Sequence, residues 1–162
     1  EVLGKKVRLW VDAGSSKSMV ANYWQAHFPL SIISSENVGS MGWGFCSAIG
    51  ASLANNKNTI VAIVGDGSMR MLGNELSTAA QYNAPVLFLI NNNKQQKSVY
   101  ERMSSKAKVV IKKASPDINW ALFSKVLGVE ATLVETEKEL VNKLLNIWPI
   151  TKPYLIDISI SE

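Results

Sequence analysis

A single acidic residue stands between two glycines in Gly65-Asp66-Gly67, directly after a run of apolar residues. A carboxylate beside residues that lack side chains leaves room for a small cation and for a bulky anion above it. Asn93 closes the next apolar run with an amide oxygen, and the backbone carbonyl of Gln95 offers a third oxygen. Mg²⁺ prefers oxygen ligands and is typically held by one or two protein oxygens together with phosphate. These residues therefore predict a magnesium site.

Two segments offer hydroxyl and backbone N–H groups that suit a phosphate. Ser68 follows Gly67 where a helix is expected to begin, and the first N–H groups of a helix commonly bind phosphate. Gly14-Ser15-Ser16 follows another apolar run. Taken alone, these patterns also describe ordinary turns and polar loops. The chemistry depends on whether the fold brings them together.

Short apolar or β-branched runs alternate with helical patterns along the chain, which is typical of a parallel sheet with helices on both faces. In such folds, ligands lie beyond the carboxyl ends of the strands. We therefore expect one α/β domain over residues 1–162, a doubly wound parallel sheet of about six strands. The predicted strands are Val7 to Val11, Ser31 to Ser34, Thr59 to Val64, Val86 to Ile90, Glu130 to Val134 and Tyr154 to Ile160. The predicted helices are Ser16 to His27, Met41 to Asn55, Leu72 to Tyr82, Ile118 to Leu127 and Thr136 to Ile147.

The composition excludes several classes of function. A chain of 162 residues with 47% hydrophobic and 19% charged residues is globular rather than disordered. Its net charge of +4 comes from scattered lysines, so we expect no nucleic-acid partner. The apolar runs are too short to span a membrane. A lone cysteine, Cys46, excludes an intrachain disulfide and suits a reducing cytoplasm.

Three ordered segments resemble the cofactor signature of thiamine diphosphate enzymes. They are "VDAGSSKSMVANYW", "VGSMGWGFCSAIGASLA", and "GDGS" followed by "ELSTAAQYNAPV" and the pair Asn92-Asn93. The likeness is greatest to the group of acetohydroxyacid synthase, pyruvate oxidase and benzaldehyde lyase, and runs from about Arg8 to Asn93. It implies the C-terminal domain that holds the diphosphate.

The resemblance also implies a role for each site residue. Asp66 and Asn93 would bind Mg²⁺ or Ca²⁺ together with the carbonyl of Gln95. Met41 would hold the cofactor in its bent form, and the carbonyl of Gly39 would accept a hydrogen bond from the pyrimidine amino group. The residues expected at the diphosphate are Gly14, Ser15, Ser16, Gly65, Gly67 and Ser68.

The reaction implied is decarboxylation of a 2-oxo acid followed by transfer of the acyl unit, most like that of acetolactate synthase. In this family the acid that activates the cofactor comes from a separate pyrimidine-binding domain, which these residues do not contain. We therefore expect no catalytic residue in this chain, a homo-oligomer, and no activity of the chain by itself. Lys97-Ser98 departs from the Gly-Met pair of the synthases, which leaves the substrate open, and Gln95 to Pro116 is predicted to be mobile.

Three alternatives stay open at this point. The chain could be the second subunit of a two-chain 2-oxo acid decarboxylase of the sulfopyruvate or phosphonopyruvate type. It could be a non-catalytic or regulatory domain that keeps the fold. It could also be an NAD-binding Rossmann unit, although the glycines at 39, 42 and 44 do not form the G-x-G-x-x-G pattern.

Overall fold

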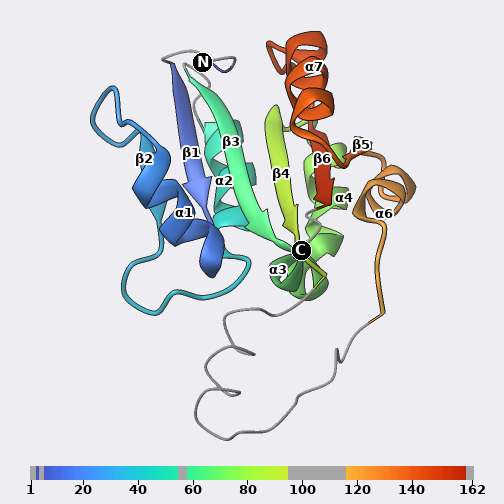
Figure 1. The fold of residues 1–162 in the computed structure, drawn as a ribbon, viewed down its shortest axis with the longest axis horizontal. Coiled ribbons are helices and arrows are strands. Elements are labelled where there is room, and N and C mark those ends of the chain that lie inside the picture. Colours follow the sequence, from blue (N-terminus) through green and yellow to red (C-terminus); the bar gives the residue numbers. More distant parts are fainter. Residues whose placement is uncertain (1–2, 4–5, 55–57, 95–115, 160–162) are drawn as a thin grey trace, which may run out of the picture.

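The computed structural model describes residues 3, 6–54, 58–94 and 116–159, in which strands and helices alternate (Figure 1). The strands are β1 (Val7–Val11), β2 (Ile32–Ser34), β3 (Thr59–Gly65), β4 (Val86–Asn92), β5 (Glu130–Val134) and β6 (Tyr154–Ser159). The helices are α1 (Ser15–Tyr23), α2 (Trp43–Ala54), α3 (Asp66–Leu72), α4 (Leu76–Gln81), α6 (Trp120–Val126) and α7 (Glu137–Ile147), with a 3-10 turn, η1 (Gly73–Glu75). Within these ranges, no helix has the length and apolar character needed to cross a lipid bilayer.

The strands form one six-stranded parallel sheet in the order β2-β1-β3-β4-β6-β5. This confirms the predicted α/β fold. From β1 the chain first adds β2 on one side and then crosses to β3 on the other side. The strand order therefore reverses between β1 and β3, and ligands of open α/β sheets bind at the carboxyl side of such a reversal.

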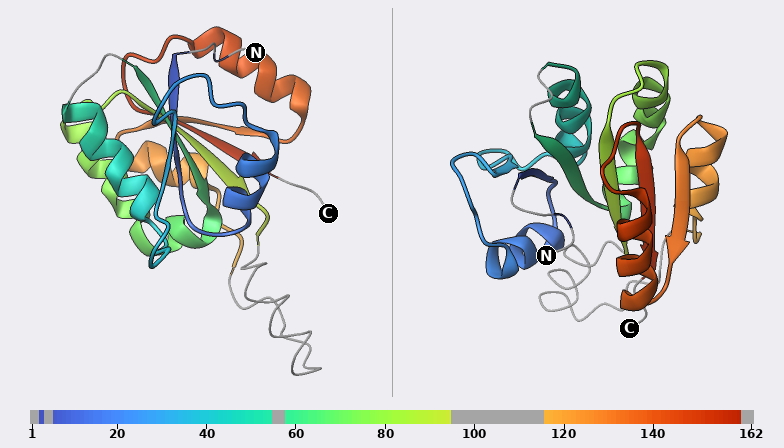
Figure 2. Two further views of the ribbon diagram at one scale, coloured as in Figure 1. Left: turned by 90° about the vertical axis from the view of Figure 1, so that its left-hand side faces the viewer. Right: turned by 90° about the horizontal axis from the view of Figure 1, so that it is seen from above.

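Helices cover both faces of the sheet, as Figure 2 shows. One face packs against α2, α3, α4 and α6, where the rings of Phe45 and Phe88 lie 5.0 Å apart between their centroids. The opposite face packs against α1 and α7 and buries Leu87 and Ile156. Because successive residues of a strand point to opposite faces, Leu87 and Phe88 of β4 enter different cores. This double coverage explains why β3 and β4 are apolar on both faces from Ile60 to Val64 and from Val86 to Ile90.

Two predicted helix ends are wrong, and local backbone conformation explains both. The first helix ends at Tyr23 rather than His27, because Trp24 has extended backbone angles of φ −85° and ψ 129°. The second begins at Trp43 rather than Met41. Gly42 has φ +85°, which a right-handed helix cannot contain.

The chain after β3 also differs from the prediction. The range predicted as one helix, Leu72 to Tyr82, contains the 3-10 turn η1 and the helix α4, which ends at Gln81. The helix α3, which was not predicted, begins at Asp66 directly after β3 and ends at Leu72, so no turn separates strand from helix. The strand β4 extends through Asn92, two residues beyond the predicted end at Ile90. Most of the predicted mobile segment, residues 95–115, lies outside the described residues, as does Ile160 at the predicted end of β6.

Candidate functional site

The predicted cofactor segments follow three neighbouring strands of the sheet. Gly14-Ser15-Ser16 comes shortly after β1, Gly65–Ser68 ends β3 and opens α3, and Asn93 comes directly after β4. The strands β1, β3 and β4 are adjacent and parallel, so their carboxyl ends share one edge, at the lower side of the sheet in Figure 1. Gly65 and Asn91 are register partners, so Asp66 comes one residue and Asn93 two residues after paired positions of adjacent strands. Gln95 lies outside the described residues.

The direct passage from β3 into α3 determines where Asp66 and Ser68 lie. Gly65 has an extended backbone (φ −83°, ψ 155°), and Asp66 is already in the first helical turn. Both Asp66 and Ser68 are buried. The hydroxyl of Ser68 is buried and has no hydrogen-bond partner among the described residues. An unpaired buried hydroxyl is costly, so this oxygen needs a partner that the described residues do not supply.

Asp12 belongs to the same edge, and the sequence prediction missed it. Its side chain is buried, and its two oxygens accept hydrogen bonds from the backbone N–H groups of Gly42, at 2.8 Å, and Gly44, at 2.9 Å. This carboxylate therefore ties the start of α2 to the end of β1. An acidic residue directly after an apolar strand, the same signal that singled out Asp66, could have identified it.

The segment before α2 contains the two residues predicted to contact the pyrimidine ring. Gly39 has φ +65°, a conformation that favours glycine, and Met41 is half-buried in the turn before the helix. The bonds from Asp12 hold the far end of this segment against β1. Met41 is thus presented by an anchored turn and not by the helix in which it was predicted.

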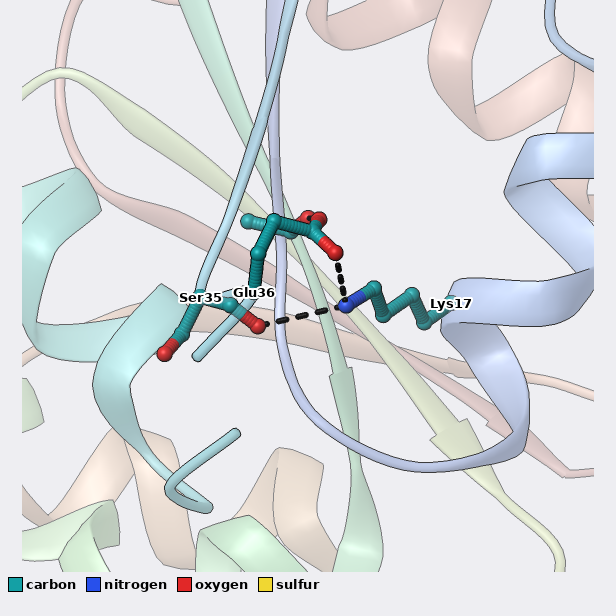
Figure 3. A network of polar contacts seen from close by, with 4 residues as sticks. Lys17, Ser35 and Glu36 are labelled. Atoms are coloured by element: carbon teal, nitrogen blue, oxygen red, sulfur yellow. Dashed lines mark hydrogen bonds and ion pairs between the residues drawn. The ribbon is translucent and has the colours of Figure 1, made fainter. Parts of the chain in front are cut away.

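Lys17 is bound to the segment after β2 (Figure 3). Its Nζ donates to the carbonyl of Ser35 at 3.2 Å and to Oε2 of Glu36 at 2.8 Å. Glu36 also accepts a hydrogen bond from the hydroxyl of Ser34. The bond from Lys17 and, to a smaller extent, the bond from Ser34 lower the pKa of the Glu36 carboxyl. The positive charge next to the predicted phosphate loop is therefore already paired.

Asn91 and Asn92, the last two residues of β4, point to opposite faces of the sheet. Asn91 donates from Nδ2 to the hydroxyl of Ser16 at 3.1 Å. Asn92 donates from Nδ2 to Oδ1 of Asp157 at 3.0 Å, on the face of the sheet that carries α6. Asn93 follows and is half-buried. The alternation of a strand thus gives Asn91 and Asn92 different neighbours.

Asp157 is a second buried acid that the sequence prediction missed. Besides Asn92, it accepts a hydrogen bond from the backbone N–H of Trp120 at 2.9 Å, so it joins β4, β6 and the start of α6. Burial raises the pKa of its carboxyl, although bonds from Asn92, Trp120 and Ala121 oppose the shift. No group of three or more His, Cys, Asp or Glu side chains able to hold a metal occurs in the described ranges. The predicted metal site does not require such a group, because it uses one carboxylate, one amide and one carbonyl.

Comparison with known protein families identifies the family of this domain and the cofactor that the family binds. The family model described as thiamine pyrophosphate enzyme, C-terminal TPP binding domain, matches residues 12–158. The chain belongs to this family. Thiamine pyrophosphate is another name for thiamine diphosphate, so the match confirms the family inferred from the sequence motifs. Between the thiamine diphosphate and the nucleotide-binding interpretations, it decides for the first.

Relatives of this TPP-binding domain are acetolactate synthases. The Haemophilus influenzae acetolactate synthase large subunit is 33% identical over 159 residues, which cover 93% of this chain and 27% of the relative. The mitochondrial acetolactate synthase of Schizosaccharomyces pombe is 30% identical, with 97% of this chain and 24% of the relative covered. The chain thus spans about a quarter of the length of these relatives.

A solved structure shares the fold. The thiamine diphosphate-dependent 4-hydroxybenzoylformate decarboxylase of Rhodococcus jostii RHA1 matches with a TM-score of 0.88 and 22% identity, covering 97% of this chain and 30% of that one. The six-stranded parallel sheet of the TPP-binding domain is therefore the fold of a known cofactor-dependent enzyme.

The residues at the carboxyl edge fit a diphosphate with a divalent cation. The buried Ser68 hydroxyl has no partner in the part of the chain that the structure describes, and a phosphate oxygen would accept its hydrogen bond. Gly14 precedes α1 with φ +116° and gives the helix no side-chain cap. The backbone N–H of Lys17 already donates to the carbonyl of Gly14, which leaves those of Ser15 and Ser16 as the donors of the first turn. The buried carboxylate of Asp66 supplies the negative charge that a cation beside phosphate requires.

We expect the Asp157→Asn variant to gain stability relative to the wild type as the pH rises. Because the folded protein raises the pKa of Asp157, folding favours its protonated form. Its stabilising contribution is complete below the ordinary pKa of 3.8 and is lost as the pH rises through the raised value. Urea unfolding of both proteins across this pH range measures the difference in free energy of unfolding.

Glu36→Gln is the control, because its expected pH dependence has the opposite sign. The pKa of Glu36 is lowered, so its contribution is present above its ordinary value of 4.5 and is lost as the pH falls. Since Glu36 is exposed, we expect only a small effect. A constant difference between the wild type and Asp157→Asn at every pH would contradict the assignment of the raised pKa to Asp157.

Proposed function

We propose that residues 1–162 bind thiamine diphosphate together with Mg²⁺ or Ca²⁺ and form the diphosphate-binding domain of a 2-oxo acid decarboxylase and carboligase, most like acetolactate synthase. The family match over residues 12–158 carries this proposal. The acetolactate synthases among the relatives support the choice of reaction. When bound, thiamine diphosphate supplies the carbon nucleophile with which a 2-oxo acid loses CO₂ and passes on its acyl unit.

The metal ligands in this proposal are the side-chain oxygens of Asp66 and Asn93 and the backbone carbonyl of Gln95. The first two residues follow adjacent parallel strands, so one cation can bridge them at the shared edge. A buried carboxylate with an amide and a carbonyl provides only oxygen ligands, which suits Mg²⁺ or Ca²⁺ better than a transition metal. The cation neutralises the diphosphate that it anchors.

The diphosphate is held by hydrogen-bond donors from two helix starts in this proposal. The hydroxyl of Ser68, whose oxygen has no partner among the described residues, donates from the α3 side. Donors from the α1 side are the hydroxyl of Ser16 and the uncapped N–H groups of the first turn. The full set of proposed cofactor-binding residues is Gly14, Ser15, Ser16, Gly39, Met41, Gly65, Gly67 and Ser68.

We further propose that a pyrimidine-binding domain, in another chain or in another part of the parent protein, covers this edge within a homo-oligomer. Large apolar side chains are exposed on three segments that border the edge: Met19 on α1, Val38 before α2, and Met71 on α3. A contiguous apolar patch is typical of an interaction surface, and these three side chains would contribute to one if the partner domain covers this edge. The covering domain would supply the acid that activates the cofactor.

We also propose that the protein is cytoplasmic, because a single cysteine, Cys46, suits a reducing compartment.

Calorimetric titration of the 162-residue chain tests the proposed ligand. We expect thiamine diphosphate to bind in the presence of Mg²⁺ and not in the presence of EDTA, while NAD gives no signal. Binding of NAD, or the absence of metal-dependent thiamine diphosphate binding, would contradict the proposal. Adding a pyrimidine-binding domain from an acetolactate synthase and measuring CO₂ release from pyruvate then separates a catalytic domain from a regulatory one.

A further inference from the structure

The carboxamide of Asn91 makes a contact between β4 and α1 that the proposed site has not used. Its Nδ2 lies 3.1 Å from Oγ of Ser16, although the two residues are 75 positions apart in the chain. Ser16 is 5% exposed and is the second residue of α1. This hydrogen bond therefore fixes a buried hydroxyl at the first turn of the helix.

The direction of the bond determines what the hydroxyl of Ser16 can do. An amide NH₂ group can only donate, so Oγ of Ser16 is the acceptor and its own hydrogen points away from Asn91. The carbonyl of Gly14, at the start of the same turn, already accepts from the backbone N–H of Lys17 at 3.2 Å. Among the described residues, the only hydrogen bond of Ser16 Oγ is the one that it accepts. The hydroxyl is thus prepared as a donor.

The buried carboxamide of Asn91 has an unpaired oxygen, which is energetically unfavourable and indicates that its hydrogen bond to Ser16 serves the site. Oδ1 of Asn91 is buried and has no hydrogen-bond partner in the part of the chain that the structure describes. An apolar side chain would avoid that cost, and Leu87 and Leu89, which share this face of β4, are apolar. The Oδ1 atom of this carboxamide therefore lacks a hydrogen bond among the described residues, while its Nδ2 atom donates to Ser16.

Neighbouring charge does not replace this donor. The ammonium group of Lys17, next to Ser16, is held by the carbonyl of Ser35 and by the carboxylate of Glu36 (Figure 3). An anion at the start of α1 would therefore depend on neutral donors, the backbone N–H groups and the hydroxyl of Ser16. The orientation of one hydroxyl matters more when the neighbouring basic side chain, Lys17, is already paired.

We propose that Asn91 is a positioning residue that orients the Ser16 hydroxyl as a hydrogen-bond donor to the diphosphate of the cofactor. The inference rests on the proposed function, because it concerns the same diphosphate. It adds a residue from β4 to a site otherwise formed by the residues after β1 and β3.

A double-mutant cycle tests whether Asn91 acts through Ser16. Calorimetry with Mg²⁺ measures the affinity for thiamine diphosphate and for inorganic pyrophosphate in Ser16→Ala, Asn91→Leu and the double variant. Ser16→Ala loses a neutral hydrogen bond to the ligand, so we expect its affinity to be about tenfold lower. Asn91→Leu keeps the Ser16 hydroxyl but no longer orients it, so we expect its affinity to be about threefold lower. The double variant should bind no more weakly than Ser16→Ala, since its hydroxyl is already missing.

Ser18→Ala is the matched control, because Ser18 is exposed on the same helix and should leave the affinity unchanged. Urea unfolding verifies that each variant is folded. The proposed role of Asn91 would be overturned if Asn91→Leu bound the ligands as tightly as the wild type or more tightly. It would also be overturned if the losses of binding free energy of the single variants added up in the double variant. Neither result would affect the proposed function. If the wild type binds neither ligand, the proposed function fails as well.

Discussion

The Asp66→Asn variant should lose the Mg²⁺-dependent binding of thiamine diphosphate, with an affinity at least about a hundredfold lower than that of the wild type. A hundredfold change corresponds to about 2.7 kcal/mol. Asp66 is the one carboxylate among the three proposed metal ligands, so the substitution removes the negative charge from this set of ligands. An amide of the same shape still provides an oxygen, but a neutral one, which binds Mg²⁺ more weakly.

The loss should come from the ligand and not from unfolding. Asp66 is in the first turn of α3, where a carboxylate interacts favourably with the backbone N–H groups. Removing that interaction costs no more than about 1 kcal/mol. Calorimetry with and without Mg²⁺, together with urea unfolding of the metal-free protein, measures the two effects separately.

Glu130→Gln is a control that makes the same change of charge away from the site. Glu130 begins β5, at the amino end of an edge strand, and pairs on the surface with Lys152. Exposed ion pairs contribute little to stability, so affinity and unfolding should both stay near the wild-type values. If Asp66→Asn binds the cofactor as tightly as Glu130→Gln, then Asp66 is not a metal ligand.

The strands were the most predictable part of the fold, because their signal is local. The central strands β3 and β4 are covered on both faces, so nearly every residue in them is apolar. The motif segments then had to lie at one edge, since the carboxyl ends of parallel strands point the same way. The positions of Asp66 and Asn93 beside neighbouring strand ends follow from that rule.

The contacts between distant segments could not be predicted from the sequence. Nothing local to Asp12 shows that its two oxygens hold the start of α2, and nothing local to Asp157 shows that it joins β4 to α6. The turn before α2 was missed because Gly42 was counted as part of a helical pattern, although its positive φ excludes a helix. Hydrophobic periodicity predicts the helices and strands. The side-chain hydrogen bonds that connect these elements form only in the assembled fold.

Adding one methyl group at Gly44 should destabilise the protein by about 3 kcal/mol. A Cβ atom there would lie 2.8 Å from both the Cα and the backbone nitrogen of Asp12, and 3.0 Å from the carbonyl carbon of Val11. These are backbone atoms at the end of β1, which cannot rotate away as a side chain could. The Gly44→Ala variant must therefore separate α2 from β1, and the hydrogen bond from Gly44 to Asp12 would break.

Gly50→Ala isolates that steric effect from the general effect of replacing a glycine in a helix. Gly50 is in the same helix, is exposed, and has no atom within 4 Å of the position of an added Cβ. Alanine favours a helix over glycine by about 1 kcal/mol, so this variant should be more stable than the wild type. Urea unfolding followed by tryptophan fluorescence measures both variants. Because the turn that presents Met41 is fastened through Gly44, we also expect Gly44→Ala alone to bind thiamine diphosphate more weakly. Equal stability of the two variants would mean that the contact between Gly44 and Asp12 does not hold α2 against β1.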